Sequence, residues 1–364
     1  MSTAMKTMQP SARGARVFLP RACSRAAACQ RPAAGGLKSK LLFLFLAASS
    51  LFAVAAPPLA LEKSIPLPGV KGGFDLMAVD ALGQRLFLCA EENNTVEVID
   101  VKAGHRLKSL PGFEEPKWAV YRPEQKRLYI SQGSGAVAVL DSRTFARVKE
   151  YKFREKANNL RFDAATGELF VGIGKTFGAV AIVDTAKDAT TGEIALANFP
   201  KQFEVEGGRI FVNVPKANHI AVIDRAKREV VATWPVTEAK DNIPMGFDRA
   251  QHRLFIGCEP GKFVVFDSVA GKSVASLDIA AESDGVHYDA KRHRIYVSCG
   301  AGSLDVITQT DADHYALTAS MPTVKGAGTS CFSPELDRLY LAVPAHDGQP
   351  AELRVYRPAA EGER

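Results

Sequence analysis

Twelve residues, spread over seven similar stretches of the chain, have side chains that could form a binding site or take part in chemistry. They are Asp75, Trp118, Asn158, Asn159, Arg161, Lys201, Gln202, Glu204, Asn242, Asp284, His287 and Ser330. Carboxylates, amides and an Arg–Glu pair suit a small polar ligand or a cation. Glu204, Arg161 and His287 offer a second use, as acid/base and charge-stabilising groups of an enzyme. Which of these uses is open depends on the elements that position the residues.

These elements are copies of one repeat. Each copy begins with a short strand that ends in an aromatic residue or Val followed by a polar residue. A turn comes next, and then a strand of the form R-L-F/Y-V. The seven copies begin at Val79, Tyr121, Phe162, Val205, Phe247, Tyr288 and Phe332, with spacings of 42, 41, 43, 42, 41 and 44 residues. A period of this length indicates a repeat fold.

A third strand follows in each copy and in five copies it ends in Asp, at Asp100, Asp141, Asp184, Asp224 and Asp267. A fourth, more polar strand comes after it. Four short antiparallel strands per repeat are typical of the blade of a β-propeller. We interpret the repeated Asp as structural, because its side chain can accept backbone N–H bonds in the turn.

The second strands are almost continuous apolar runs, such as RLFLC and RIYVS. A strand has this composition when both of its faces are buried, as they are between neighbouring blades. The seventh copy supplies three strands and ends at Arg357. We therefore expect segment 61–69 to supply its fourth strand and close the ring. The sequence predicts an all-β, seven-bladed propeller of four-stranded antiparallel blades, with the N-terminal strand in the last blade.

The R-L-Y-I or R-I-Y-V strand, together with the V-x-V-I-D strand, resembles the YVTN-repeat β-propellers, specifically the YncE-like exported proteins. The resemblance covers essentially the whole chain after the leader. It implies an exported, WD40-like binding or scaffold protein without enzymatic activity. An enzyme, either a lactonase-type hydrolase or a dehydrogenase-like propeller, is the alternative, because propellers host many activities.

Residues that precede the first strand of each blade converge at one mouth of the central channel. The twelve residues above therefore predict a polar pocket there; the alternative is an ordinary solvent-filled channel in which Arg161 and Glu204 simply pair. His287 and Cys331 lie on adjacent blades and are both metal-ligand types. Two ligands are too few, so we expect a core histidine, no metal and no cofactor.

The first 60 residues form a separate targeting segment. Eight basic side chains precede the first acid, Glu62, whereas the formal net charge is +6, so the remainder of the chain carries −2. Lys38 and Lys40 precede an apolar segment, 41–56, that is short for a membrane span and ends in small residues. The pattern predicts a signal peptide and a periplasmic or secreted protein, cleaved at Ala53-Val54-Ala55 or at Ala60; an organelle transit sequence or a retained anchor are alternatives.

The domain organisation predicted is therefore a targeting segment 1–60, a propeller 61–357 and a tail 358–364. The near-neutral charge, without a basic stripe, disfavours nucleic acid. We expect a monomer, with no stable membrane span after cleavage, that binds a protein, a peptide or a small polar ligand at one face. Cys258 and Cys299 hold equivalent positions in neighbouring blades, about 10 Å apart, too far for a disulfide. We expect both to be free and buried.

Overall fold

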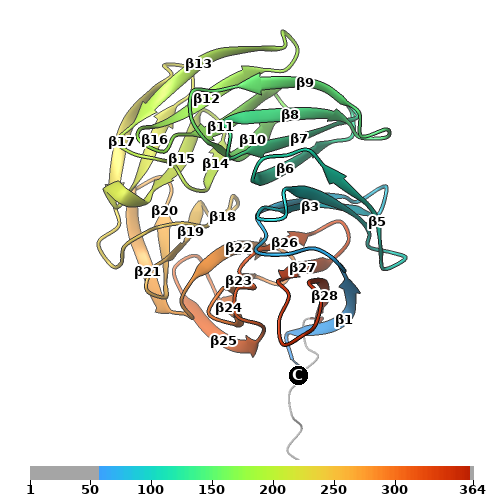
Figure 1. Ribbon diagram of the computed structural model, residues 1–364. Coiled ribbons are helices and arrows are strands. Elements are labelled where there is room, and N and C mark those ends of the chain that lie inside the picture. Colours follow the sequence, from blue (N-terminus) through green and yellow to red (C-terminus); the bar gives the residue numbers. More distant parts are fainter. Residues whose placement is uncertain (1–56, 361–364) are drawn as a thin grey trace, which may run out of the picture. The chain divides into compact units, whose positions relative to one another are not determined.

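The first strand of every blade is the inner strand of a four-stranded antiparallel sheet. The computed structural model describes residues 57–360, which contain seven such sheets; in six of them the strands follow sequence order, and in the seventh the N-terminal strand is added outside the last three. The inner strands are β2 (Met77–Asp80), β6 (Pro116–Arg122), β10 (Ala157–Asp163), β14 (Phe203–Glu206), β18 (Met245–Asp248), β22 (Ser283–Asp289) and β26 (Ser330–Ser333). In Figure 1 the sheets follow one another around a common centre. The predicted fold class, an all-β propeller of seven antiparallel blades, is confirmed.

The second strands have five buried residues in succession after their first residue. They are β3 (Arg85–Ala90), β7 (Arg127–Gln132), β11 (Glu168–Ile173), β15 (Arg209–Val214), β19 (Arg253–Cys258), β23 (Arg294–Cys299) and β27 (Arg338–Val343). This burial matches their apolar runs, because a blade on each side covers both faces.

The third strands carry the repeated Asp at their ends. They are β4 (Thr95–Asp100), β8 (Ala136–Asp141), β12 (Gly178–Asp184), β16 (His219–Asp224), β20 (Lys262–Asp267), β24 (Ser303–Gln309) and β28 (Glu352–Pro358). In all five copies that have it, the Asp side chain accepts one or two backbone N–H bonds from residues two or three positions later. The structural role predicted for this Asp is confirmed.

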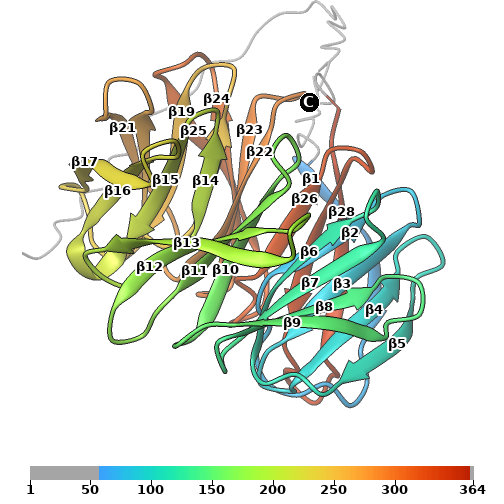
Figure 2. The same ribbon diagram turned by 90° about the horizontal axis from the view of Figure 1, so that it is seen from above.

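The outer strands consist mainly of exposed and half-buried residues. They are β5 (His105–Pro111), β9 (Arg147–Lys152), β13 (Ala189–Leu196), β17 (Glu229–Pro235), β21 (Lys272–Asp278), β25 (Tyr315–Pro322) and β1 (Leu59–Pro66). β1 is antiparallel to β28 in the seventh blade, and Figures 1 and 2 show the two strands side by side. One 3₁₀ turn, η1 (Pro215–Ala217), is the only helical element between residues 57 and 360.

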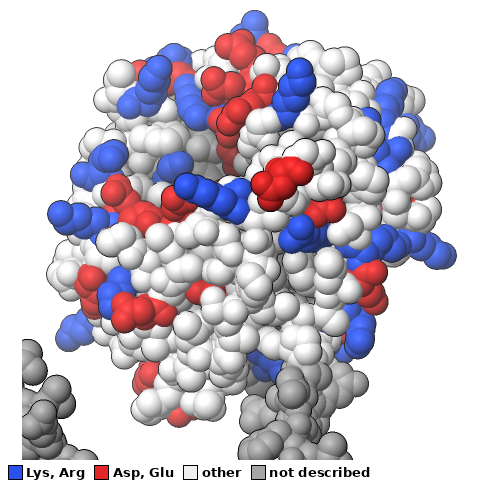
Figure 3. Space-filling model, turned by 60° about the horizontal axis from the view of Figure 1, so that its bottom comes forward, with Lys and Arg blue, Asp and Glu red and all other residues white. Residues whose placement is uncertain are grey.

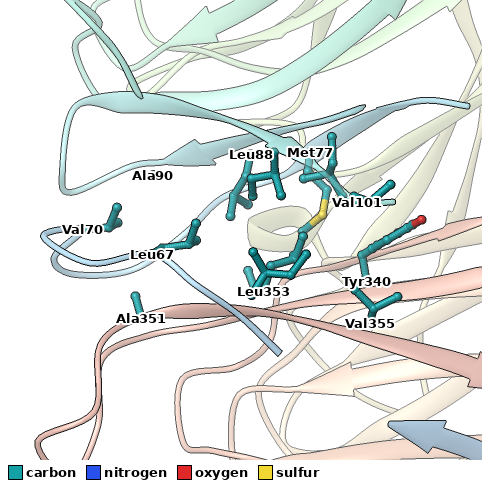
Figure 4. Packing of buried hydrophobic residues seen from close by; sticks show 14 residues of the cluster. Leu67, Val70, Met77, Leu88, Ala90, Val101, Tyr340, Ala351, Leu353 and Val355 are labelled. Atoms are coloured by element: carbon teal, nitrogen blue, oxygen red, sulfur yellow. The ribbon is translucent and has the colours of Figure 1, made fainter. Parts of the chain in front are cut away.

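The hydrophobic core is divided among the interfaces between blades. Seven buried clusters occur, and each joins residues of two neighbouring blades. Figure 4 shows the cluster between the seventh and first blades, where Tyr340 and Leu353 face Met77 and Leu88. Because the interface between the last and first blades is packed like the others, the sheets form a closed ring.

The expected export signal, including the apolar segment 41–56 and the first cleavage site, lies outside the described residues. The described residues belong to one compact unit. No helix within residues 57–360 has the length and apolar character needed to cross a membrane.

Candidate functional site

A cavity of about 280 Å³ lies where the seven inner strands meet. We call it the central pocket; every blade lines it, either with its inner strand or with the residue just before that strand. Six of the twelve predicted residues line it: Trp118, Arg161, Gln202, Glu204, His287 and Ser330.

One wall of the central pocket is a chain of charged groups. The Arg161 guanidinium lies 4.4 Å from the centre of the Trp118 ring, and its Nη2 donates to Glu204 Oε1 at 3.0 Å. Arg249 Nη2 donates to the other oxygen of Glu204, also at 3.0 Å, and Arg249 Nε pairs with Glu206. The expected Arg161–Glu204 pair is thus present and is held on both sides. Two cations and two carboxylates balance, so this wall is polar but close to neutral.

The opposite wall is a chain of hydrogen bonds. His287 Nε2 lies 3.0 Å from Ser330 Oγ, which lies 2.7 Å from Ser298 Oγ. Ser298 donates its proton to the carbonyl of Gly328, so it must accept the proton of Ser330. His287 Nε2 is then the donor to Ser330. Burial lowers the pKa of His287 to about 4, so the imidazole is neutral at physiological pH.

Cys331 and His287 both line the central pocket, and their residue types could bind a metal ion. Burial raises the pKa of Cys331 to about 12, which keeps it as an unreactive thiol. Among the described residues, no three His, Cys, Asp or Glu side chains are grouped so as to hold a metal ion. Cys258 and Cys299 are free and buried, which confirms the expectation for these two thiols.

Three of the other predicted residues form a second group with Lys117. We call Asp75, Lys117, Lys201 and Asp284 the start-side cluster, because they precede or begin the inner strands. Burial and the nearby Asp284 carboxylate raise the pKa of Asp75 to about 7, against the attraction of the two lysines. Burial also raises the pKa of Asp284. Four charged groups therefore interact away from bulk water.

Lys117 is the most deeply buried residue of this cluster. Its side chain is 2% exposed and pairs with Glu91 and Glu115. Burial lowers the pKa of Lys117 to about 8. Gln202 connects the two groups of residues, since it lines the central pocket and donates from Nε2 to the Asp284 carbonyl at 2.9 Å.

The three predicted asparagines lie outside the central pocket. Asn242 is fully buried, and its Nδ2 donates to Asn213 Oδ1 and to the His219 carbonyl. Asn158 is also buried, and its carbonyl accepts the Ser131 hydroxyl at 2.5 Å. The Asn159 side chain is buried too, and its Nδ2 has no hydrogen-bond partner.

The main residue of the central pocket that the sequence reasoning missed is Arg249. It lies beyond the end of β18 and reaches back to Glu204 and Glu206. Its only signal in the sequence is its place two residues after Phe247, the aromatic residue of that copy. That place lies in the turn after the inner strand, where the repeat does not predict a side chain that faces the centre. Apolar residues from the inner strands complete the lining, among them Met77, Met245 and Phe332.

Comparison with known proteins identifies the class of fold. No family model matches the sequence, and no curated protein matches it. The chain is similar to a chain of "Crystal Structure of Mitotic Checkpoint Complex", with a TM-score of 0.70 and 13% identity over 92% of this chain and 98% of that one. It is also similar to a chain of "Crystal structure of RRP9 WD40 repeats" (TM-score 0.69, 11% identity, 82% and 99% covered).

A third similar structure is "Kuenenia stuttgartiensis Hydrazine Synthase", with a TM-score of 0.69 and 17% identity over 81% of this chain and 99% of that one. The structural similarity establishes the fold, a WD40-like β-propeller. At identities this low it establishes no activity.

Proposed function

We propose that this chain is an exported, WD40-like propeller of the YVTN type that binds a small polar ligand in its central pocket. The observation that carries the proposal is the convergence of all seven blades on one cavity whose polar residues differ from copy to copy. Residues that the repeat needs for folding recur at equivalent positions in most or all blades. The Trp118–Arg161–Glu204 wall does not recur, so the repeat does not account for it.

The lining suits a ligand with an apolar body and a hydrogen-bonding head. Leu76, Met245 and Val286 supply apolar surface, whereas Gln202 and Arg161 supply donors. Polar and apolar surface contribute about equally to the lining, so the central pocket is more polar than the usual small-molecule site and suits a polar ligand. Figure 3 shows acidic and basic side chains interspersed over one face, with both signs gathered around a hollow.

Hydrolysis is the second candidate, because His287 lies within hydrogen-bond distance of Ser330. A nucleophilic serine gives its proton to the histidine, but here the proton of Ser330 is directed to Ser298. The lowered pKa of His287 also makes its imidazole a weak base. Both facts favour binding over catalysis.

Export is supported by the basic, then apolar leader of the sequence. A protein partner at the pocket mouth is the other occupant that the propeller fold suggests, since one of the similar chains comes from a complex.

The test compares two arginines with the same surroundings. Arg161 and Arg225 each stack on an aromatic ring and pair with carboxylate, but only Arg161 lines the central pocket. Purified protein is examined by native mass spectrometry for a retained ligand and by thermal shift against sugars, lactones and aromatic carboxylic acids. We expect Arg161→Gln to weaken binding of any hit at least about tenfold, as loss of a charge-assisted hydrogen bond does, and Arg225→Gln to leave it unchanged.

Equal binding by wild type and Arg161→Gln would refute the assignment of the central pocket. Hydrolysis of an ester or lactone that is lost in Ser330→Ala would replace the binding proposal with the enzymatic one.

A further inference from the structure

Three members of the start-side cluster are charged groups that the fold brings together without pairing them. Asp75 comes two residues before the inner strand of the first blade, Lys201 two residues before that of the fourth, and Asp284 is the second residue of β22 in the sixth. All three are half-buried. Among residues 57–360, none of these three groups forms an ion pair within 4.0 Å, whereas Lys117 is paired with Glu91 and Glu115.

A hydroxyl of the seventh blade connects the two aspartates. The Thr329 Oγ1 atom lies 3.1 Å from the carbonyl oxygen of Phe74, the residue before Asp75, and 3.4 Å from Asp284 Oδ2. The Asp284 carboxylate is also one of the causes that raise the pKa of Asp75 to about 7. Contact geometry and electrostatics therefore both place the two carboxylates near each other.

An amide of the fourth blade brings Lys201 to the same place. Gln202, the next residue, donates from Nε2 to the Asp284 carbonyl at 2.9 Å. The positive charge of Lys201 lowers the pKa of both Asp75 and Asp284, against the effect of burial. Lys201 is thus close enough to act on both carboxylates but does not touch either of them.

Each of the three groups has a free atom that solvent can reach. The Lys201 Nζ atom has no hydrogen bond within the described chain and lies 6.0 Å from the centre of the Phe199 ring. Asp75 accepts the N–H of Leu76 with Oδ1 only, and Asp284 accepts a bond with Oδ2 only. The free atoms are not among the sealed polar atoms of residues 57–360. Charges held partly away from water without a partner are unfavourable, and a ligand can supply the partners.

A ligand with a single charge does not suit these groups. An anion is repelled by the carboxylates of Asp75 and Asp284, and a cation is repelled by the ammonium groups of Lys117 and Lys201. A metal ion also lacks ligands, because no three His, Cys, Asp or Glu side chains of the described chain are grouped to hold one. A molecule with one charge of each sign can meet both kinds of group.

We propose that the start-side cluster binds a small zwitterion of the amino-acid class, with its ammonium group between Asp75 and Asp284 and its carboxylate at Lys201. Charge-assisted hydrogen bonds then replace the missing ion pairs, and the net charge of the site does not change. None of these three residues lines the central pocket, which instead extends to Arg249 and Pro334 beyond the ends of the inner strands. The proposal therefore does not depend on the function proposed for that pocket.

The probe is glycine, titrated into the purified protein near neutral pH and followed by calorimetry. Methylammonium chloride and sodium acetate, each carrying one of the two charges of glycine, are titrated at the same ionic strength. We expect saturable binding of glycine. Each of the other two compounds should bind at least about tenfold more weakly, because it forms charge-assisted hydrogen bonds with only one side of the site.

Two lysines provide the matched comparison. Lys240 also precedes an inner strand, that of the fifth blade, and forms no ion pair within residues 57–360, but it is exposed. We expect Lys201→Gln to weaken glycine binding at least about tenfold, to the level of methylammonium, as loss of a charge-assisted hydrogen bond does. Lys240→Gln should leave glycine binding unchanged. Asp284→Asn should weaken glycine in the same way and leave only the response to acetate.

Three results would overturn the proposal. They are the absence of saturable glycine binding, binding of acetate or methylammonium as tight as that of glycine, and equal effects of Lys201→Gln and Lys240→Gln. The first two are measured on wild-type protein, so they decide the matter even where a variant does not fold.

Discussion

Asp75 shows how a single buried carboxyl links stability to pH. Burial and Asp284 raise its pKa from 3.8 to about 7 in the folded protein. Between these two values the folded state holds a proton that the unfolded state has lost, so the contribution of Asp75 to stability falls as the pH rises from about 4 to 7. We predict that Asp75→Asn raises the Tm by several degrees near pH 8 and has little effect near pH 4, measured by thermal unfolding across this range.

Asp141 provides a control with the opposite sign. It is half-buried, and backbone N–H bonds from Thr144 and Arg143 hold the pKa of its carboxyl below the usual range. Its contribution is therefore present above about pH 4 and lost on acidification. Asp141→Asn should lower the Tm near pH 8. An Asp75→Asn variant with an unchanged Tm near pH 8 would show that Asp75 is not a strained charge.

His287 titrates in the opposite sense to Asp75. Its pKa is lowered to about 4 by burial, so the unfolded state, with the ordinary pKa of 6.5, binds a proton first as the pH falls. The contribution of His287 to stability therefore decreases from about pH 6.5 down to pH 4. We predict that His287→Gln flattens the loss of Tm over this interval, measured by thermal unfolding in parallel with Asp75→Asn. A variant that keeps the wild-type slope would contradict a buried, neutral His287.

The role of residues that recur in the repeat could be predicted from the sequence. The positions of residues that occur in one copy only were predicted less well. The repeated Asp recurs at one position of the repeat, which identified it as a turn residue before any contact was known. Asp75 and Asn242 were both assigned to the channel mouth, yet Asn242 is enclosed by Asn213 and His219. Register irregularities in inner strands, such as the one between Ser283 and Gly285 of β22, change which side chains face the centre.

At the scale of the element, the outer strands share a feature that their spacing does not reveal. All seven contain a register shift at which one residue is inserted opposite the third strand. In four blades the inserted residue is apolar and 37–49% exposed: Leu107, Val148, Val231 and Val274. Such bulges bend an edge strand away from regular pairing.

The bulges hinder pairing of the outer strands with other molecules. The four apolar side chains at the bulges are exposed and do not contribute to the core. We predict that replacing all four with Thr leaves the Tm within about 5 °C of wild type, since each surface substitution changes stability by about 0.5 kcal/mol or less and 1 kcal/mol shifts the Tm of a large domain by about 2–4 °C. The same variant should remain soluble at higher concentration, measured by light scattering during concentration. A large fall in Tm would mean that these side chains pack against something in the folded protein.

At the scale of the molecule, the sequence predicted the number of blades because each blade repeats the same four-strand pattern. The central pocket was predicted less well. Its shape depends on how seven inner strands tilt and on residues such as Arg249 that reach back from a turn. Each of the seven interfaces has its own hydrophobic cluster, so in a closed ring no blade has a free face, unlike the terminal repeats of a linear array.

Strand β1 contributes to two of these interfaces at once. Leu59 and Ile65 are both fully buried, Leu59 with the sixth and seventh blades and Ile65 with the seventh and first. Burying a Leu or Ile side chain is worth about 2–3 kcal/mol, so both together approach the net stability of an ordinary domain, about 5–15 kcal/mol. Under the proposed export, cleavage after Ala55 would keep Leu59, whereas cleavage after Ala60 would remove it.

We therefore predict three stabilities for three start points. A chain beginning at Ala56 should unfold in one transition, a chain beginning at Leu61 should have a Tm lower by about 5 °C, and a chain beginning at Leu67 should be largely unfolded at 37 °C. Calorimetry gives the Tm values. If the chain is exported as proposed, N-terminal sequencing of the mature protein should show Ala56 as its first residue. A Leu67 chain with the Tm of the Ala56 chain would mean that the ring does not depend on β1. In that case the seventh blade would be stable with three strands, and the N-terminal segment would be free to serve another purpose.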